Sequence, residues 1–187
     1  YPSIHSPTEG TRGMVVSQNA IASEAGAKIL REGGNAVDAA IAVGFALSVT
    51  LPRAGNIGGD GYMSVFEPAS GELRVIFFRS LPPPAGPPAM FVDNRGKERA
   101  VASYGYLAPA VPGTVAGFDY AHRKWGKLSW DKIVAPAIAL AAGGVRLSAD
   151  EAFVFSWGKD RLSKSAAGKA AFYKPDGSLY QKDEVMK

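Results

Sequence analysis

The chain has 187 residues, of which 47% are hydrophobic and 20% charged, an ordinary globular composition that excludes collagen-like, coiled-coil and wholly disordered proteins. It has no cysteine and two histidines, which excludes disulfide frameworks and thiolate chemistry, and we expect neither a metal nor a cofactor. The net charge is +4, but the basic residues are interleaved with acidic ones and form no nucleic-acid-binding motif, so we expect no nucleic-acid partner.

The N-terminal part predicts a short strand followed by two helices. Residues 1–12 read as an extended arm and residues 14–17 as a strand. Ile21, Ala25 and Ile29 then fall on one face of a helix that Gly33 and Gly34 end.

The second helix is predicted over residues 36–50 and is apolar on every side, which is typical of a core helix. Asn35 is placed to cap it, and Asp38 is placed to complete a capping box. The apolar stretch is interrupted by Asp38 and is shorter than the ~20 residues that cross a bilayer, so we expect no membrane span.

A glycine-rich loop, residues 55–61, precedes two predicted strands at 62–67 and 73–78. The segment 68–71 between them carries a hairpin signal, and the aromatic and β-branched residues on both sides predict a buried antiparallel sheet. This order of elements indicates an α+β protein and argues against a Rossmann arrangement.

The C-terminal half predicts three helices. A proline cluster at 82–88 marks extended backbone, and a weak strand is expected up to Ser103. We expect Thr114 to cap the first helix, with Val115, Phe118 and His122 on one face. The second helix starts after Ser129 and contains Pro136, a capping box at 148–151 starts the third, and residues 163–187 read as a surface segment.

The residues that could carry chemistry are few. The glycine loop has neither the spacing of a dinucleotide-binding loop nor the lysine of a P-loop. Asp60, within it, is a single carboxylate and therefore no metal site. Arg79 follows a buried strand and precedes the prolines, where its guanidinium suits the binding of a carboxylate. An internal ion pair with an Asp or Glu explains the same placement, and both explanations remain open.

Three strings in combination resemble the γ-glutamyltranspeptidase family. They are residues 23–40 (SEAGAKILREGGNAVDAA), residues 54–63 (AGNIGGDGYM) and residues 111–117 (VPGTVAG), and the match runs from about residue 10 to at least residue 150. The resemblance implies the N-terminal part of an αββα N-terminal-nucleophile hydrolase sandwich. On this basis residues 1–187 are the N-terminal portion of the large subunit, in a single domain.

The resemblance also implies a mechanism. Family members cleave themselves into two subunits, and the new N-terminal Thr of the small subunit attacks γ-glutamyl amides such as glutathione, with its own amine as base. We therefore expect no catalytic residue in this chain, a small catalytic subunit from the same precursor as partner, and a small amide as substrate. The protein is expected to be periplasmic or secreted, its leader not being part of the chain, although a cytoplasmic location stays open.

One functional position of the family falls within the chain. The arginine that grips the α-carboxylate of the glutamyl group corresponds to Arg79. The acidic residues that flank this arginine in the family are replaced by Phe77 and Ser80, and Asp60 stands where many members have glycine. Two alternatives therefore remain, which are a related amidohydrolase acting on cephalosporin side chains or small oxo-acid amides, and a catalytically silent binding protein on the same fold.

Overall fold

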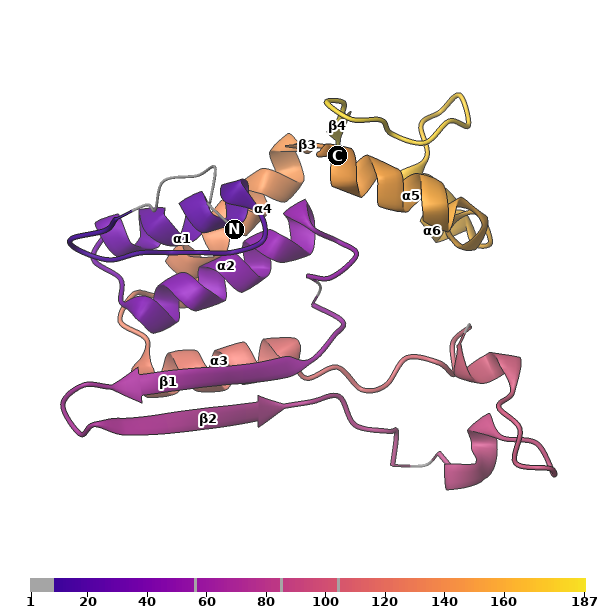
Figure 1. Ribbon diagram of the computed structural model, residues 1–187, viewed down its shortest axis with the longest axis horizontal. Coiled ribbons are helices and arrows are strands. Elements are labelled where there is room, and N and C mark those ends of the chain that lie inside the picture. Colours follow the sequence, from indigo (N-terminus) through magenta and orange to yellow (C-terminus); the bar gives the residue numbers. More distant parts are fainter. Residues whose placement is uncertain (1–8, 56, 85, 104) are drawn as a thin grey trace, which may run out of the picture. The chain divides into compact units, whose positions relative to one another are not determined.

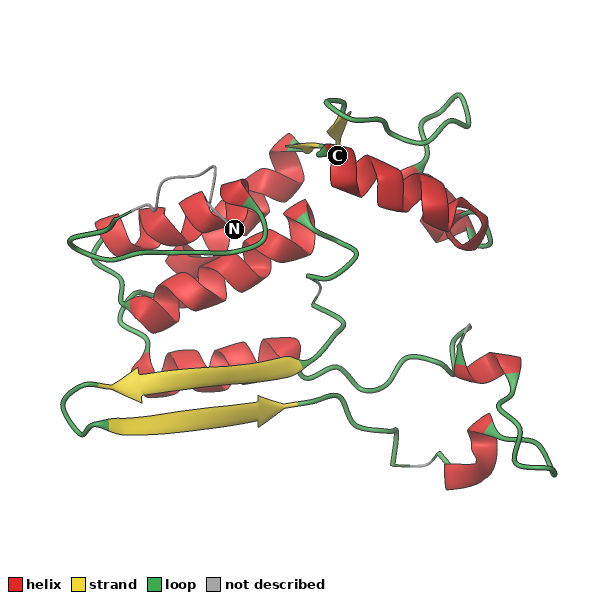
Figure 2. Cartoon of the chain, in the orientation of Figure 1, coloured by secondary structure: helices red, strands yellow, loops and turns green. Residues whose placement is uncertain are grey.

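The computed structural model describes residues 9–187 except positions 56, 85 and 104, and it combines helices with two small sheets (Figures 1 and 2). The described residues form two compact units. The first unit joins the residues before position 57 to Trp125–Lys187, and the second is Ile57–Lys124. The expected α+β class is confirmed. Most of the arm expected at 1–12 lies outside the described residues.

Helices α1 (Ala20–Arg31) and α2 (Ala36–Thr50) pack against each other through small side chains. At Gly26 of α1, a β-carbon would lie 2.5 Å from Cγ2 of Val43, so the two helices approach too closely for any larger residue. The apolar face expected for α1 is partly wrong, because Ile21 is 39% exposed. The buried cluster between the helices consists of Ala22, Ala25, Val43 and Ala46.

Helix α2 is the core helix that its composition predicts. Nine of its fifteen residues are buried, and they are distributed around the helix. Its Phe45 meets Trp130 of α4 (Trp130–Gly143) edge to face, with ring centroids 5.6 Å apart. Helix α4 continues through Pro136 and ends before Gly144, whose φ of 83° is readily adopted by glycine. The core of the first unit therefore lies around α2.

Asn35 and Asp38 form the expected capping box and also hold a distant segment. Asp38 accepts a bond from the Asn35 N–H at 3.0 Å, and the Asn35 side chain accepts one from the Asp38 N–H at 3.0 Å. The same carboxylate, fully buried, accepts from the backbone N–H groups of Lys127 at 3.0 Å and Leu128 at 3.2 Å. The capping box thus fixes the segment that precedes α4.

The C-terminal part of the first unit contains two helices, α5 (Ala149–Leu162) and α6 (Ala166–Phe172). A two-residue strand, β3 (Val145–Arg146), pairs antiparallel with β4 (Val185–Met186) near the end of the chain. The segment 163–187, expected at the surface, thus contains a helix and a strand.

The turn after α2 is tied to the start of α5 by ion pairs. Arg53 donates from Nε to Oε1 of Glu151 at 2.7 Å, and from Nη2 to Asp150. Glu151 donates its backbone N–H to Ser148, at 3.1 Å, so half of the predicted capping box is present. The Glu151 side chain turns to Arg53 instead of completing the box.

The second unit contains the predicted hairpin and one long helix. Strands β1 (Gly61–Glu67) and β2 (Glu72–Phe78) are antiparallel in a register that pairs Gly61 with Phe78 and Glu67 with Glu72. Gly71 takes a φ of 70° in the turn. Helix α3 (Thr114–Trp125) packs on β2 through an edge-to-face contact of Phe118 with Phe78, with ring centroids 5.9 Å apart.

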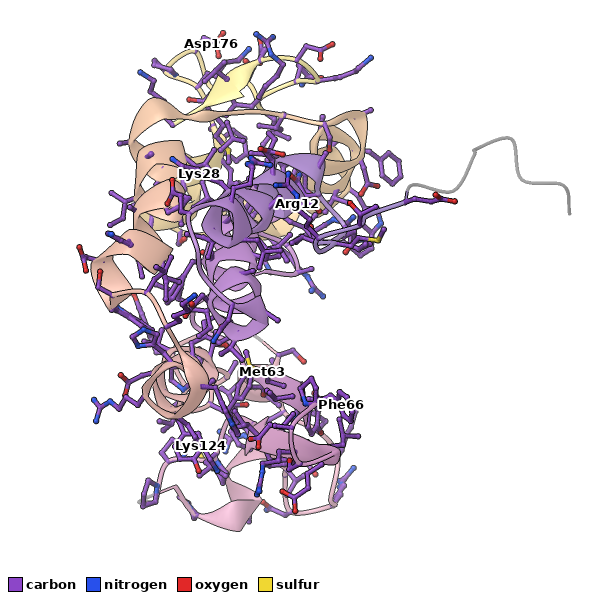
Figure 3. All side chains as sticks on the ribbon, turned by 90° about the vertical axis from the view of Figure 1, so that its left-hand side faces the viewer. Arg12, Lys28, Met63, Phe66, Lys124 and Asp176 are labelled. Atoms are coloured by element: carbon purple, nitrogen blue, oxygen red, sulfur yellow. The ribbon has the colours of Figure 1, made fainter. Side chains whose placement is uncertain are left out.

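One face of this hairpin is exposed, which corrects the expectation of a buried sheet. Each large apolar side chain on this face is more than 60% exposed. The rings of Tyr62 and Phe77 meet edge to face across the two strands, with centroids 5.1 Å apart. Met63 lies on the opposite face of the strand from Phe66, and both are labelled in Figure 3. No layer covers the exposed face within the described part of the second unit. The apolar residues of this face are Tyr62, Phe66, Leu73, Val75 and Phe77.

Three local expectations are wrong. Residues 14–17 form no strand, because no ladder partner for them lies among the described residues. The segment before Ser103 contains the short 3₁₀ helices η1 (Pro88–Phe91) and η2 (Ala100–Ala102) in place of a strand.

The third concerns α3, which begins at Thr114 itself, so this residue is the first of the helix and not its cap. Val115 is 42% exposed, because the buried face of the helix runs through Gly117, Phe118 and Ala121.

Candidate functional site: an arginine–aspartate pair at the end of the hairpin

Arg79 lies directly after the last residue of β2, and Asp60 lies directly before the first residue of β1. Because Gly61 pairs with Phe78, one further step in the same register brings Asp60 opposite Arg79. The Arg79 Nη1 donates to Oδ1 of Asp60 at 2.6 Å. The hairpin register therefore positions both charged side chains at the same end of the sheet.

Ser80 completes the anchoring of Asp60. The backbone N–H of Ser80 donates to Oδ2 of Asp60 at 3.0 Å, and the Ser80 hydroxyl donates to the same oxygen. These two bonds, with the charge and hydrogen bond of Arg79 as a smaller contribution, hold the pKa of the Asp60 carboxyl below its usual 3.8. Asp60 is therefore ionised at neutral pH.

Arg79 is the accessible member of the pair. Its side chain is 50% exposed, whereas that of Asp60 is 17% exposed. A guanidinium carries five N–H donors, and among the described residues Arg79 bonds only to Asp60, through Nη1. The edge formed by Nε and Nη2 is thus available for a two-pronged bond to a carboxylate. The ion pair that the sequence left as an alternative is present and leaves this edge available.

The glycine loop and the 111–117 segment pack together next to the end of the hairpin that carries Arg79 and Asp60. The carbonyl of Gly59 accepts from the N–H groups of Gly113 at 3.0 Å and Thr114 at 3.1 Å, so it binds two of the donors at the start of α3. A β-carbon on Gly113 would lie 2.1 Å from the carbonyl oxygen of Phe78, and one on Gly117 would lie 2.3 Å from the Phe78 ring. Both glycines are needed for this close approach.

The backbone after Arg79 is also fixed. Leu81 and Val111 exchange two hydrogen bonds, with Leu81 N–H donating at 3.2 Å and Val111 N–H donating at 2.9 Å. The chain segments on both sides of Arg79 are therefore held, by β2 before it and by this bridge after it. Such support limits how far the guanidinium can move from the end of the hairpin.

Asp60 is the residue that sequence reasoning missed as a partner of Arg79. On the sequence alone it is treated as a single carboxylate in the glycine loop, but the equal lengths of the two predicted strands already contained the signal. Counting both strands outward from the 68–71 turn places Asp60 opposite Arg79. Among the residues that the structure describes, no group of His, Asp and Glu side chains could hold a metal ion. No helix within the described ranges is long and apolar enough to span a membrane.

Comparison with known proteins gives consistent matches. The family model described as Gamma-glutamyltranspeptidase matches residues 22–187. The "Glutathione hydrolase proenzyme" of Escherichia coli (strain K12) is 40% identical over 184 residues, covering 96% of this chain and 31% of that protein. The chain therefore spans about a third of the length of such relatives.

Solved structures agree with the sequence matches. The crystal structure of Helicobacter pylori γ-glutamyltranspeptidase matches with a TM-score of 0.92 and 37% identity, over 97% of this chain and 52% of that one. The cephalosporin acylase from Bacillus halodurans matches with a TM-score of 0.85 and 27% identity, over 100% of this chain and 35% of that one.

Proposed function

Because this chain belongs to the γ-glutamyltranspeptidase family, we propose that it is the N-terminal portion of the large subunit of an enzyme that cleaves γ-glutamyl amides such as glutathione. In this proposal the nucleophile is the N-terminal Thr of a small subunit that lies outside the chain. Its hydroxyl oxygen attacks the amide carbon while its own amine takes the proton, and the amine of the substrate leaves. Water or an acceptor amine then releases the acyl group.

Arg79 carries the contribution of this chain to the reaction. Its side chain is half-exposed, its backbone is held on both sides, and its Nε and Nη2 edge is available to a ligand. We infer that this edge binds the α-carboxylate of the γ-glutamyl group. Arg79 would thereby fix the donor, and the scissile amide would be presented to the small subunit.

Kinetics of the Arg79→Lys variant of the complete, processed enzyme tests this role. An ammonium keeps the charge but loses the paired donors, so kcat/KM for γ-glutamyl-4-nitroanilide should fall about ten- to a hundredfold, the equivalent of one hydrogen bond to a charged group. For the matching neutral amide, in which the α-carboxylate is replaced by a carboxamide, the loss should be small. Equal losses on both donors would assign Arg79 a purely structural role.

A matched control is available on the same strand. Arg74 is 44% exposed and pairs with Glu67 and Glu72 at the other end of the hairpin. Arg74→Lys makes the same chemical change at a side chain of similar exposure. It should leave kcat/KM for both donors unchanged. A comparable loss in this variant would show that the hairpin, and not the carboxylate contact, is being disturbed.

A related amidohydrolase is the second candidate function. It is favoured by the match to the cephalosporin acylase, which covers all of this chain. Higher turnover of a glutaryl amide than of the γ-glutamyl amide would support the related amidohydrolase over the γ-glutamyl enzyme. An unprocessed, inactive precursor would select a silent binding protein instead.

We further propose that the precursor is cleaved and that the small subunit remains bound. The exposed apolar face of the hairpin supports this, because contiguous apolar surface of this kind marks an interaction site. Intact mass of the purified protein should show two chains that co-elute, and a single full-length mass would refute cleavage. We also propose a periplasmic or secreted location, which cell fractionation tests directly.

A further inference from the structure

Asp60 places a fixed negative charge beside the proposed carboxylate-binding edge. Its Oδ1 is 2.6 Å from Nη1 of Arg79, and its Oδ2 is held by both the backbone N–H and the hydroxyl of Ser80. With three hydrogen bonds and 17% exposure, this carboxylate cannot rotate away when a ligand arrives. A ligand at Arg79 therefore meets a pair of opposite charges and not an isolated cation.

The direction of the Asp60 contact leaves a defined place for the ligand. In a guanidinium, Nε–H and one Nη2–H point the same way and form a side-on fork, while Nη1 lies on the other side. Asp60 occupies Nη1, so a carboxylate can bind the fork without displacing it. The Asp60 charge then stays on the Nη1 side of the guanidinium while the ligand carboxylate occupies the Nε and Nη2 side, so both carboxylates border the same guanidinium.

We propose that Asp60 is a specificity-determining residue that positions Arg79 and makes this subsite favour a carboxylate carrying a neighbouring ammonium group over a carboxylate alone. This inference rests on the proposed function. It identifies the preferred donors as amides of zwitterionic amino acids, and it identifies deamino diacid amides, such as glutaryl amides, as the disfavoured class.

The reason is the balance of charge. Arg79 and Asp60 together are neutral, so a lone carboxylate gains attraction from one and repulsion from the other. An α-ammonium group on the adjacent carbon offsets that repulsion because its positive charge is attracted to the negative charge of Asp60. Removing the negative charge of Asp60 should therefore raise kcat/KM for the donor that carries only a carboxylate and lower kcat/KM for the zwitterionic donor.

The experiment compares two donors in the complete, processed enzyme. The ratio of kcat/KM for γ-glutamyl-4-nitroanilide to that for glutaryl-4-nitroanilide is measured in the native protein and in Asp60→Asn, which is nearly isosteric. We expect the ratio to fall about tenfold, the effect of one partly screened charge. An unchanged ratio overturns the inference.

Two controls separate charge from structure. Ser80→Ala removes the hydroxyl bond but keeps the Asp60 charge, and Glu72→Gln removes a negative charge at the far end of the hairpin. Both should retain the native ratio, whatever their absolute rates. A tenfold fall in either control would also overturn the inference.

The outcome distinguishes this inference from the proposed function. If Asp60→Asn keeps the native ratio of kcat/KM values while Arg79→Lys still lowers kcat/KM for donors that carry the carboxylate, Asp60 has no role in selectivity. In that case the proposed γ-glutamyl activity is retained. If the processed native enzyme turns over neither donor, the proposed function fails and this inference fails with it. If Asp60→Asn is not processed into two subunits, the native enzyme is tested by inhibition with L-glutamate, which carries the ammonium group, and with glutarate, which lacks it. Equal inhibition by the two compounds contradicts a preference for the zwitterion.

Discussion

Replacing Asp38 by alanine should destabilise the first unit more than any single surface change. The carboxylate is fully buried and accepts from the backbone N–H groups of Asn35, Lys127 and Leu128. Asp38→Ala leaves these three donors without an acceptor. Each buried, unpaired donor costs about 1–3 kcal/mol, so even the lower limit gives a loss of about 3 kcal/mol. This is a large part of the 5–15 kcal/mol that holds a typical domain folded.

Hydrogen exchange of the complete protein, followed by mass spectrometry, measures this loss where it occurs. Peptides covering residues 125–130 should exchange about a hundredfold faster in Asp38→Ala, since 1.4 kcal/mol corresponds to a factor of ten. Asp119→Ala is the control, because it removes an exposed carboxylate bound to Arg123 and should change stability by less than about 0.5 kcal/mol. Equal protection of 125–130 in both variants would refute the view that Asp38 holds this segment.

Two further predictions concern packing and acid stability. Gly117→Ala should lower stability by about 1–3 kcal/mol in thermal unfolding, because the added carbon overlaps the Phe78 ring, and an unchanged melting temperature would contradict the close approach of α3 to β2. The Lys174 side chain and a backbone N–H lower the pKa of Glu184 from 4.5, so this carboxylate stabilises the fold above pH 4.5 and loses its effect as the pH falls through the lowered pKa. Glu184→Gln should therefore reduce stability at neutral pH and converge with the native protein in acid, and a constant difference at all pH values would argue against this pair.

Features governed by neighbouring residues could be predicted from the sequence. The capping box of Asn35 and Asp38 depends on two residues three positions apart, and the helix that it starts is apolar around its whole circumference. The hairpin is signalled by two strands of equal length around a short turn. Arg79 was singled out because it follows the second of these strands. In each case the signal and the structure lie within a short stretch of the sequence.

Features that depend on distant partners could not be predicted in the same way. Residues 14–17 have the composition of a strand, but a strand needs a ladder partner, and the described residues contain none. The side chain of Glu151 was expected to complete a local cap, but it bonds to Arg53, which lies 98 positions away in the sequence. The burial of α3 was misassigned because Phe78, and not the period of the helix, selects the face that packs.

The arrangement of the first unit also has a consequence for synthesis on the ribosome. Asp38 lies 89 and 90 positions before its partners Lys127 and Leu128, and the whole of the second unit is encoded between them. At about 5–20 residues per second, on the order of ten seconds separate the emergence of the carboxylate from that of the N–H groups that it binds. Throughout this interval α2 exposes apolar surface that α4 later covers. The hairpin, whose partners are close in sequence, can form during the same interval, so the inserted unit is expected to fold before the unit that surrounds it in sequence is complete.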